Sequence, residues 1–96
     1  MNATMLLQLI AEPAQAERLS DLLAEAGLAQ GWYETPLDWV GGDAPYAGAR
    51  ERVLGRRPRL RFELLADEAT AARLEAEIAR RLPAVLCLRL PLLARG

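Results

Sequence analysis

The chain of 96 residues contains no lysine and no histidine, and it has one cysteine and few aromatic residues. Histidine is the commonest general base and a frequent metal ligand near neutral pH, so its absence argues against acid–base catalysis and against a zinc or copper site. Cys87 has no second cysteine with which to form an intramolecular disulfide, which fits a reducing compartment. We therefore expect a protein that is not an enzyme and holds no metal, and the sequence leaves its cofactor unknown.

A surplus of charge and a long apolar run are also missing. Twelve basic residues, all arginine, nearly balance thirteen acidic ones, and the net charge of −1 provides no field that attracts nucleic acid. No run approaches the roughly 20 apolar residues that span a bilayer. The apolar N-terminal run is interrupted by Gln8, ends at Glu12 and has no basic residue before it, unlike a signal peptide. We expect a cytoplasmic protein with no nucleic-acid partner and no membrane insertion.

The first half of the chain predicts strand, helix and a second strand. Residues 4–12 are too apolar for a surface helix and favour a central strand. A helix is expected over residues 13–27, because apolar side chains recur at helical spacing between an initial proline and a terminal glycine. Residues 31–40 favour a strand, but Pro36 makes it an irregular or edge strand.

The second half predicts strand, helix and strand after a connection. Residues 41–55 are rich in glycine and small residues, although "AGARERVL" is compatible with a short helical turn. Residues 57–66 alternate between apolar and charged side chains, as a half-buried strand does. Asp67 is placed to cap a helix that Pro83 ends, and residues 84–96 favour a fourth strand.

This order predicts an α+β fold, the ferredoxin-like βαββαβ sandwich, as a single domain over residues 1–96 in which two helices cover one face of an antiparallel sheet. The helix-facing side is expected to take Met5, Leu7, Leu9, Leu60, Phe62, Leu64, Leu86, Leu88 and Leu90. The other side is expected to take Leu6, Gln8, Ile10, Arg59, Arg61, Glu63, Val85, Cys87 and Arg89. That side is too apolar for water and carries charges of both signs, so we expect a symmetric oligomer to bury it.

The segment "AERLSDLLAEAG" followed by "ETPLDWVGGDAPYAGARERVLGRRPRLRFELL" resembles a PII-like family of small bacterial proteins that are often encoded beside heavy-metal efflux pumps. The most specific part is "ARERVLGRRPRLRFELL", residues 49–65. The resemblance implies a homotrimer with its sheets turned toward the three-fold axis and small ligands at the clefts between subunits. It also implies a long mobile loop at residues 36–56 and a membrane transporter or other protein as partner.

The chain departs from this family at two places. Relatives often carry histidines in the long loop, where this chain has "GGDAPYAG". Nucleotide-binding members have a glycine-rich loop with basic residues before the last strand, where this chain has "ARRLPAV". The sequence therefore predicts neither a histidine metal site nor a cradle for a triphosphate.

Candidate binding residues gather in and beside the predicted loop. Guanidinium groups bind phosphate or carboxylate through paired N–H donors, and large aromatic rings favour protein recognition. Alternatively, Arg59 and Arg61 pair with Glu63 or a neighbouring subunit, and Arg56 and Arg57 are solvated. In the same reading, Trp39 packs over the sheet edge and Tyr46 anchors the loop. The residues predicted to bind a ligand or partner are Trp39, Tyr46, Arg52, Arg56, Arg57 and Arg59. The residues predicted to form the oligomer interface are Leu6, Gln8, Ile10, Arg61, Glu63, Cys87 and Arg89.

The expected function is that of a non-enzymatic, trimeric regulatory or sensor protein of PII-like type, in which loop and clefts report a small ligand or ion to a partner, with metal efflux as one context. Two alternatives stay open. One is a regulatory module of the ACT type that binds amino acids, although such modules have a short connection between the second and third strands. The other is a structural or interaction protein without a ligand.

Overall fold

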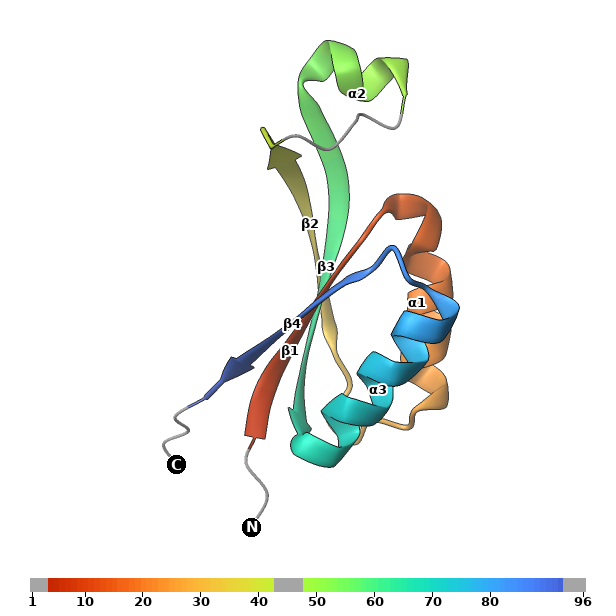
Figure 1. Cartoon of the computed structure of the whole chain (residues 1–96), viewed down its shortest axis with the longest axis vertical. Helices are drawn as coiled ribbons and strands as arrows, with labels where there is room; N and C mark the ends of the chain where they lie inside the picture. Colours follow the sequence, from red (N-terminus) through yellow and green to blue (C-terminus); the bar gives the residue numbers. More distant parts are fainter. Residues whose placement is uncertain (1–3, 43–47, 93–96) are drawn as a thin grey trace.

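Strands and helices alternate along the chain in the computed structural model, which describes residues 4–42 and 48–92 (Figure 1). The elements are β1 (Thr4–Ala11), α1 (Pro13–Glu25), β2 (Tyr33–Val40), α2 (Ala49–Leu54), β3 (Arg56–Asp67), α3 (Glu68–Arg81) and β4 (Leu86–Pro91). None of the helices in the described part of the chain is long and apolar enough to cross a membrane.

Helix α3 has clear start and stop signals. The Asp67 side chain accepts a hydrogen bond from the backbone N–H of Thr70 at 2.8 Å, which satisfies one of the free donors of the first turn. Glu68 lies in the first turn and Arg80 and Arg81 in the last, so their charges oppose the helix dipole. Helix α1 instead starts with Pro13 and is followed by Gly27 in the left-handed region (φ 65°).

The antiparallel sheet has the strand order β2-β3-β1-β4, and α1 and α3 cover one of its faces (Figure 1). Leu7 lies opposite Leu64 and Leu9 opposite Phe62, so the two central strands present matching apolar rows to the helices. The predicted α+β, ferredoxin-like βαββαβ fold is confirmed. The largest fully buried side chains are Phe62, Leu7, Leu9, Leu19, Leu23, Leu74 and Ile78.

Strands β2 and β3 extend beyond the rest of the sheet. Strand β1 ends with Ala11 opposite Leu60, whereas β2 and β3 continue to pair from Leu37 opposite Arg59 to Val40 opposite Arg56. We call residues 37–40, residues 56–59 and α2 the arm; it projects past α1 and α3 and carries α2 at its tip (Figure 1). The molecule is accordingly elongated, with extents of 49 × 27 × 19 Å.

The connection between β2 and β3 is shorter than the predicted loop at residues 36–56. Residues 36–40 belong to β2 and Arg56 begins β3, which leaves residues 41–55 with α2 inside them. Pro36 did not end the strand because β2 lies at the sheet edge, where a missing backbone N–H is tolerated.

The predicted faces of the fourth strand were wrong. Cys87 lies opposite Leu9 and Arg89 opposite Leu7, so both lie on the helix-covered side, and Val85 is buried in the core. Leu86, Leu88 and Leu90 are exposed on the other side, which we call the open face. A shift of one residue moves every side chain of a strand to the opposite face. The geometric reason for assigning Cys87 and Arg89 to the interface therefore does not hold.

The core predicts a large stability cost at Phe62, which is fully buried. Phe62→Ala should lower the free energy of unfolding by about 3–5 kcal/mol, because it removes a buried ring and leaves a cavity. Urea unfolding at one fixed protein concentration measures this. Val40→Ala, at a position 61% exposed on the arm, is the control and should change the value by less than about 0.5 kcal/mol. Equal losses in both variants would contradict the assigned core.

Candidate functional site

A hollow of about 280 Å³ lies where the arm joins the sheet, and we call it the arm-base hollow. Trp39 lies opposite Arg57 on one side, and Ile10 lies opposite Leu86 on the other, so the hollow opens on the open face. Its walls therefore combine an indole ring, aliphatic side chains and charged groups. The lining residues are Ile10, Glu12, Trp39, Arg57, Arg59, Ala84 and Leu86.

Arg57 is the most buried charged residue of the described chain, with 3% of its surface exposed. Its Nη1 donates a hydrogen bond of 2.7 Å to the carbonyl oxygen of Gly41, just after β2 ends. Gly41 has φ 80°, a left-handed conformation that favours glycine. The guanidinium thus fixes the point where the chain leaves β2, and it does so beside the indole of Trp39, which is 44% exposed.

Arg59 is the second arginine of the hollow. Its side chain is 15% exposed, with Nη2 3.9 Å from Glu12 Oε1, and Nη1 donates a 2.6 Å hydrogen bond to the carbonyl oxygen of Pro58. Arg56 lies on the opposite side of the strand and forms an exposed ion pair of 3.6 Å with Asp38. Of the four predicted arginines, three lie on β3, and the strand brings Arg57 and Arg59 together and turns Arg56 away.

Arg52, another predicted binding residue, is not among the residues that line the hollow. Arg52 lies exposed on α2 at the tip of the arm. Tyr46 lies outside the described residues. The hollow also contains groups that the sequence did not single out: Glu12, Ala84 and Leu86. The β1–β4 register brings Ile10 opposite Leu86, a pairing that no local sequence pattern marks.

A polar cluster lies on the open face among exposed leucines. Glu63 is only 6% exposed; its carboxylate accepts a 3.2 Å hydrogen bond from Gln8 Nε2 and lies 3.3 Å from Arg61 Nε. Tyr33 lies opposite Glu63 in the register, and a side-chain hydrogen bond with that carboxylate raises the pKa of the Tyr33 hydroxyl above its usual value. Gln8, Arg61 and Glu63 thus lie on the predicted face; their interface role stays a prediction.

Cys87 and Arg89 have different partners on the helix-covered side. Arg89 pairs with Glu75 and, at 2.8 Å, with Glu68 of α3, and these hydrogen bonds raise its pKa. Burial, and secondarily the charge of Glu75, raise the pKa of the Cys87 thiol, which keeps it protonated and unreactive near neutral pH. Among the described residues, no three histidine, cysteine or acidic side chains are grouped to hold a metal ion.

Comparisons with known proteins place the chain among PII-like folds. A family profile described as "Protein of unknown function (DUF3240)" matches residues 1–87. A crystal structure of a DUF3240 family protein from Shewanella baltica has a TM-score of 0.71 and 20% identity, covering 100% of this chain and 97% of that one. No curated protein matches the sequence.

Two further structures share the fold. CutA from Synechococcus elongatus, complexed with Bis-Tris, has a TM-score of 0.69 and 20% identity over 100% of this chain and 86% of that one. CPII, a nitrogen regulatory PII-like protein from Thiomonas intermedia bound to ADP, AMP and bicarbonate, has a TM-score of 0.65 and 17% identity over 97% and 96%. At such low identities the likeness establishes a common fold.

The contact between Arg57 and Gly41 predicts a local effect on the arm. Arg57→Gln should speed amide hydrogen exchange in residues 37–40 about tenfold or more, because a charged hydrogen bond contributes about 1.5–3 kcal/mol. Hydrogen exchange followed by mass spectrometry or NMR measures this. Arg56→Gln removes only an exposed ion pair and should leave the rates within about twofold. Equal acceleration in both variants would refute the anchoring role of Arg57.

Proposed function

The chain belongs to the DUF3240 family, and from this membership and its PII-like fold we propose that it is a non-enzymatic regulatory protein that acts as a trimer. In this proposal a small anionic ligand binds in the arm-base hollow, and the arm carries the signal to a partner protein. The observation that carries the proposal is the position of Arg57, Arg59 and Trp39 around one hollow at the root of a projecting arm.

The open face supports self-association. Tyr33, Leu65, Leu86, Leu88 and Leu90 are each between 41% and 55% exposed on it. A contiguous apolar surface of this kind marks an association site. In a closed symmetric oligomer, every subunit buries this same surface against its neighbours. The arm-base hollow opens on the same face, so a neighbouring subunit would supply its missing wall.

The charges of the hollow favour an anion. Guanidinium groups bind carboxylate, bicarbonate or phosphate oxygens through paired N–H donors, and the Trp39 indole offers a face for stacking. Glu12 also lines the hollow, 3.9 Å from Arg59, and disfavours an anion that extends toward it. The ADP, AMP and bicarbonate bound by CPII from Thiomonas intermedia are therefore the first candidates to test on this chain.

The arm is the part of the molecule best placed to meet a partner. It projects beyond the helices and exposes Trp39, Val40 and Arg52 (Figure 1). A ligand shifts the arm between conformations only if it binds one of them more tightly, and the hollow touches the base of the arm at Trp39 and Arg57. The family resemblance suggests a membrane transporter in metal efflux as the partner and the cytoplasm as the location.

The proposed assembly predicts a mass of about three times 10.6 kDa by sedimentation equilibrium or native mass spectrometry. Leu88→Arg places a charge on the open face and should convert the trimer to monomers, because a buried unpaired charge is costly. Val40→Arg, at an exposed position of the arm and not on the open face, should leave the mass unchanged. A stable monomer for the wild-type protein would overturn the trimer, and two copies would favour the ACT-type alternative.

The proposed ligand site predicts a change in Trp39 fluorescence when bicarbonate, AMP or ADP binds. A Trp32→Phe background isolates the Trp39 signal. Arg59→Gln should weaken binding about tenfold or more, since charged hydrogen bonds contribute about 1.5–3 kcal/mol. Arg56→Gln, on the other side of the strand, should leave the affinity within about twofold. If none of these anions changes the signal, or if both variants lose affinity equally, the site assignment fails.

A further inference from the structure

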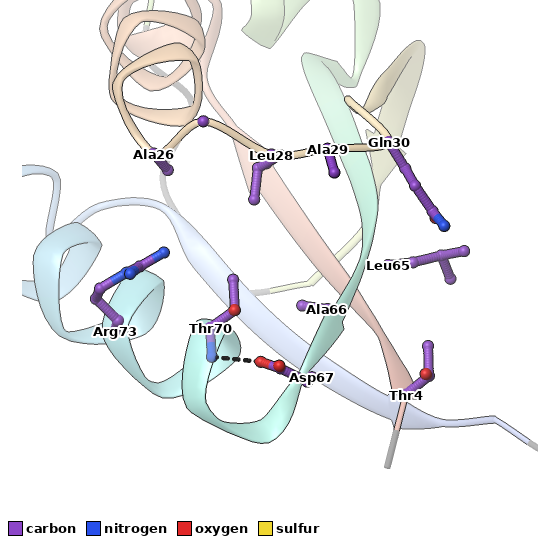
Figure 2. A pocket seen from close by; sticks show the side chains of 11 residues that line it. Thr4, Ala26, Leu28, Ala29, Gln30, Leu65, Ala66, Asp67, Thr70 and Arg73 are labelled. Atoms are coloured by element: carbon purple, nitrogen blue, oxygen red, sulfur yellow. Dashed lines mark hydrogen bonds between the residues drawn. The ribbon is translucent and has the colours of Figure 1, made fainter. Parts of the chain in front are cut away.

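A second cavity, of about 360 Å³, is shown in Figure 2. The segments that line it lie at the end of the domain opposite the arm (Figure 1). Four segments that are far apart in the sequence form it: Thr4 at the start of β1, residues 26–30 after α1, the end of β3 and the first turns of α3. We call this cavity the far-end pocket. It shares no lining residue with the arm-base hollow, so a ligand here would occupy a separate site.

Arg73 is the cationic group of the far-end pocket. It extends from α3 toward the loop that follows α1, one turn beyond Thr70 on the same side of the helix (Figure 2). Within the described residues its guanidinium makes no ion pair. On the same helix, by contrast, Arg80 pairs with Glu77 at 2.7 Å and Arg81 with Glu25 at 3.2 Å.

The other walls divide into polar and apolar parts. Thr70 adds a hydroxyl beside Arg73, and Ala26, Leu28 and Ala66 supply an apolar surface (Figure 2). Asp67 Oδ1 is occupied by its hydrogen bond to the Thr70 backbone N–H, but its negative charge remains close. The charges of Arg73 and Asp67 cancel, so the pocket has no excess positive charge with which to hold a polyphosphate. A ligand with one carboxylate needs only direct contact with the Arg73 guanidinium.

We propose that the far-end pocket binds a small carboxylic acid of about four to six carbon atoms in all, with an apolar body, a size suited to a pocket near the lower end of the usual range. The carboxylate takes the paired donors of Arg73 and the hydroxyl of Thr70. The hydrocarbon part lies against Ala26, Leu28 and Ala66, where its transfer from water is favourable. The protein would then respond to two ligands: an anion in the arm-base hollow and a carboxylic acid in the far-end pocket.

Isothermal titration with butanoate and 3-methylbutanoate tests the proposal, with 3-methylbutanamide as the neutral analogue and inorganic phosphate as the competing anion. We expect the carboxylates to bind and to shift the amide NMR signals of Ala29 and Thr70. Arg73→Gln should weaken binding tenfold or more, whereas Arg80→Gln, the matched variant on the same helix, should leave it within about twofold. Ala29→Leu, at an exposed loop position, should block the pocket without changing its charge.

Each other outcome overturns the inference. The far-end pocket is not a carboxylate site if neither acid binds, if the amide binds as tightly as the acid, or if Arg73→Gln and Arg80→Gln lose affinity equally. Stronger binding of phosphate would reject the monocarboxylate class. If Arg59→Gln abolishes the signal while Arg73→Gln does not, the acids bind at the arm-base hollow instead, and the proposal for that hollow survives without this one.

Discussion

The structure depends on a sheet that carries apolar side chains on both faces, although helices cover only one of them. On β1, Leu7 and Leu9 pack under α1 and α3, and Leu6 and Ile10 point to the open face. Burial of the first pair supplies the core of the domain. The second pair, with the exposed leucines of β4, makes a surface whose apolar area is best removed from water by another molecule. The arm-base hollow lies at the edge of that surface, so the proposed oligomer would place the hollow beside a subunit boundary.

Much of the fold follows from local signals, and the errors occur where the answer depends on distant residues. The alternation around Phe62 gave the correct faces of β3, and Asp67 caps α3 as its position suggested. The faces of β4 were predicted wrongly because its leucines alternate with Val85, Cys87 and Arg89, and the alternation alone does not say which row faces the helices. The register with β1 decides this. Arg89 can lie on the covered side because β4 is an edge strand, where its guanidinium reaches the carboxylates of α3.

The site was only partly predictable for the same reason. Strand periodicity separates Arg56 from Arg57 and Arg59, but the burial of Arg57 depends on the carbonyl of Gly41, 16 residues earlier. The closeness of Tyr33 and Glu63 likewise depends on the β2–β3 register. The far-end pocket joins the loop after α1 to α3, and no pattern within either segment marks it. Residue type predicted anion chemistry, whereas tertiary contacts decide which arginines share a site.

Strand β3 is unbroken from Arg56 to Asp67, and it lies between β2 and β1 for the inner part of that length. At about 3.3 Å per residue, such a strand is roughly 40 Å long. Because the same backbone forms both the arm and the middle of the sheet, the arm is continuous with the sheet and has no flexible hinge at its base on this strand. A force on α2 is therefore transmitted through β3 to the sheet. The bending stiffness of this one strand limits how far α2 can move.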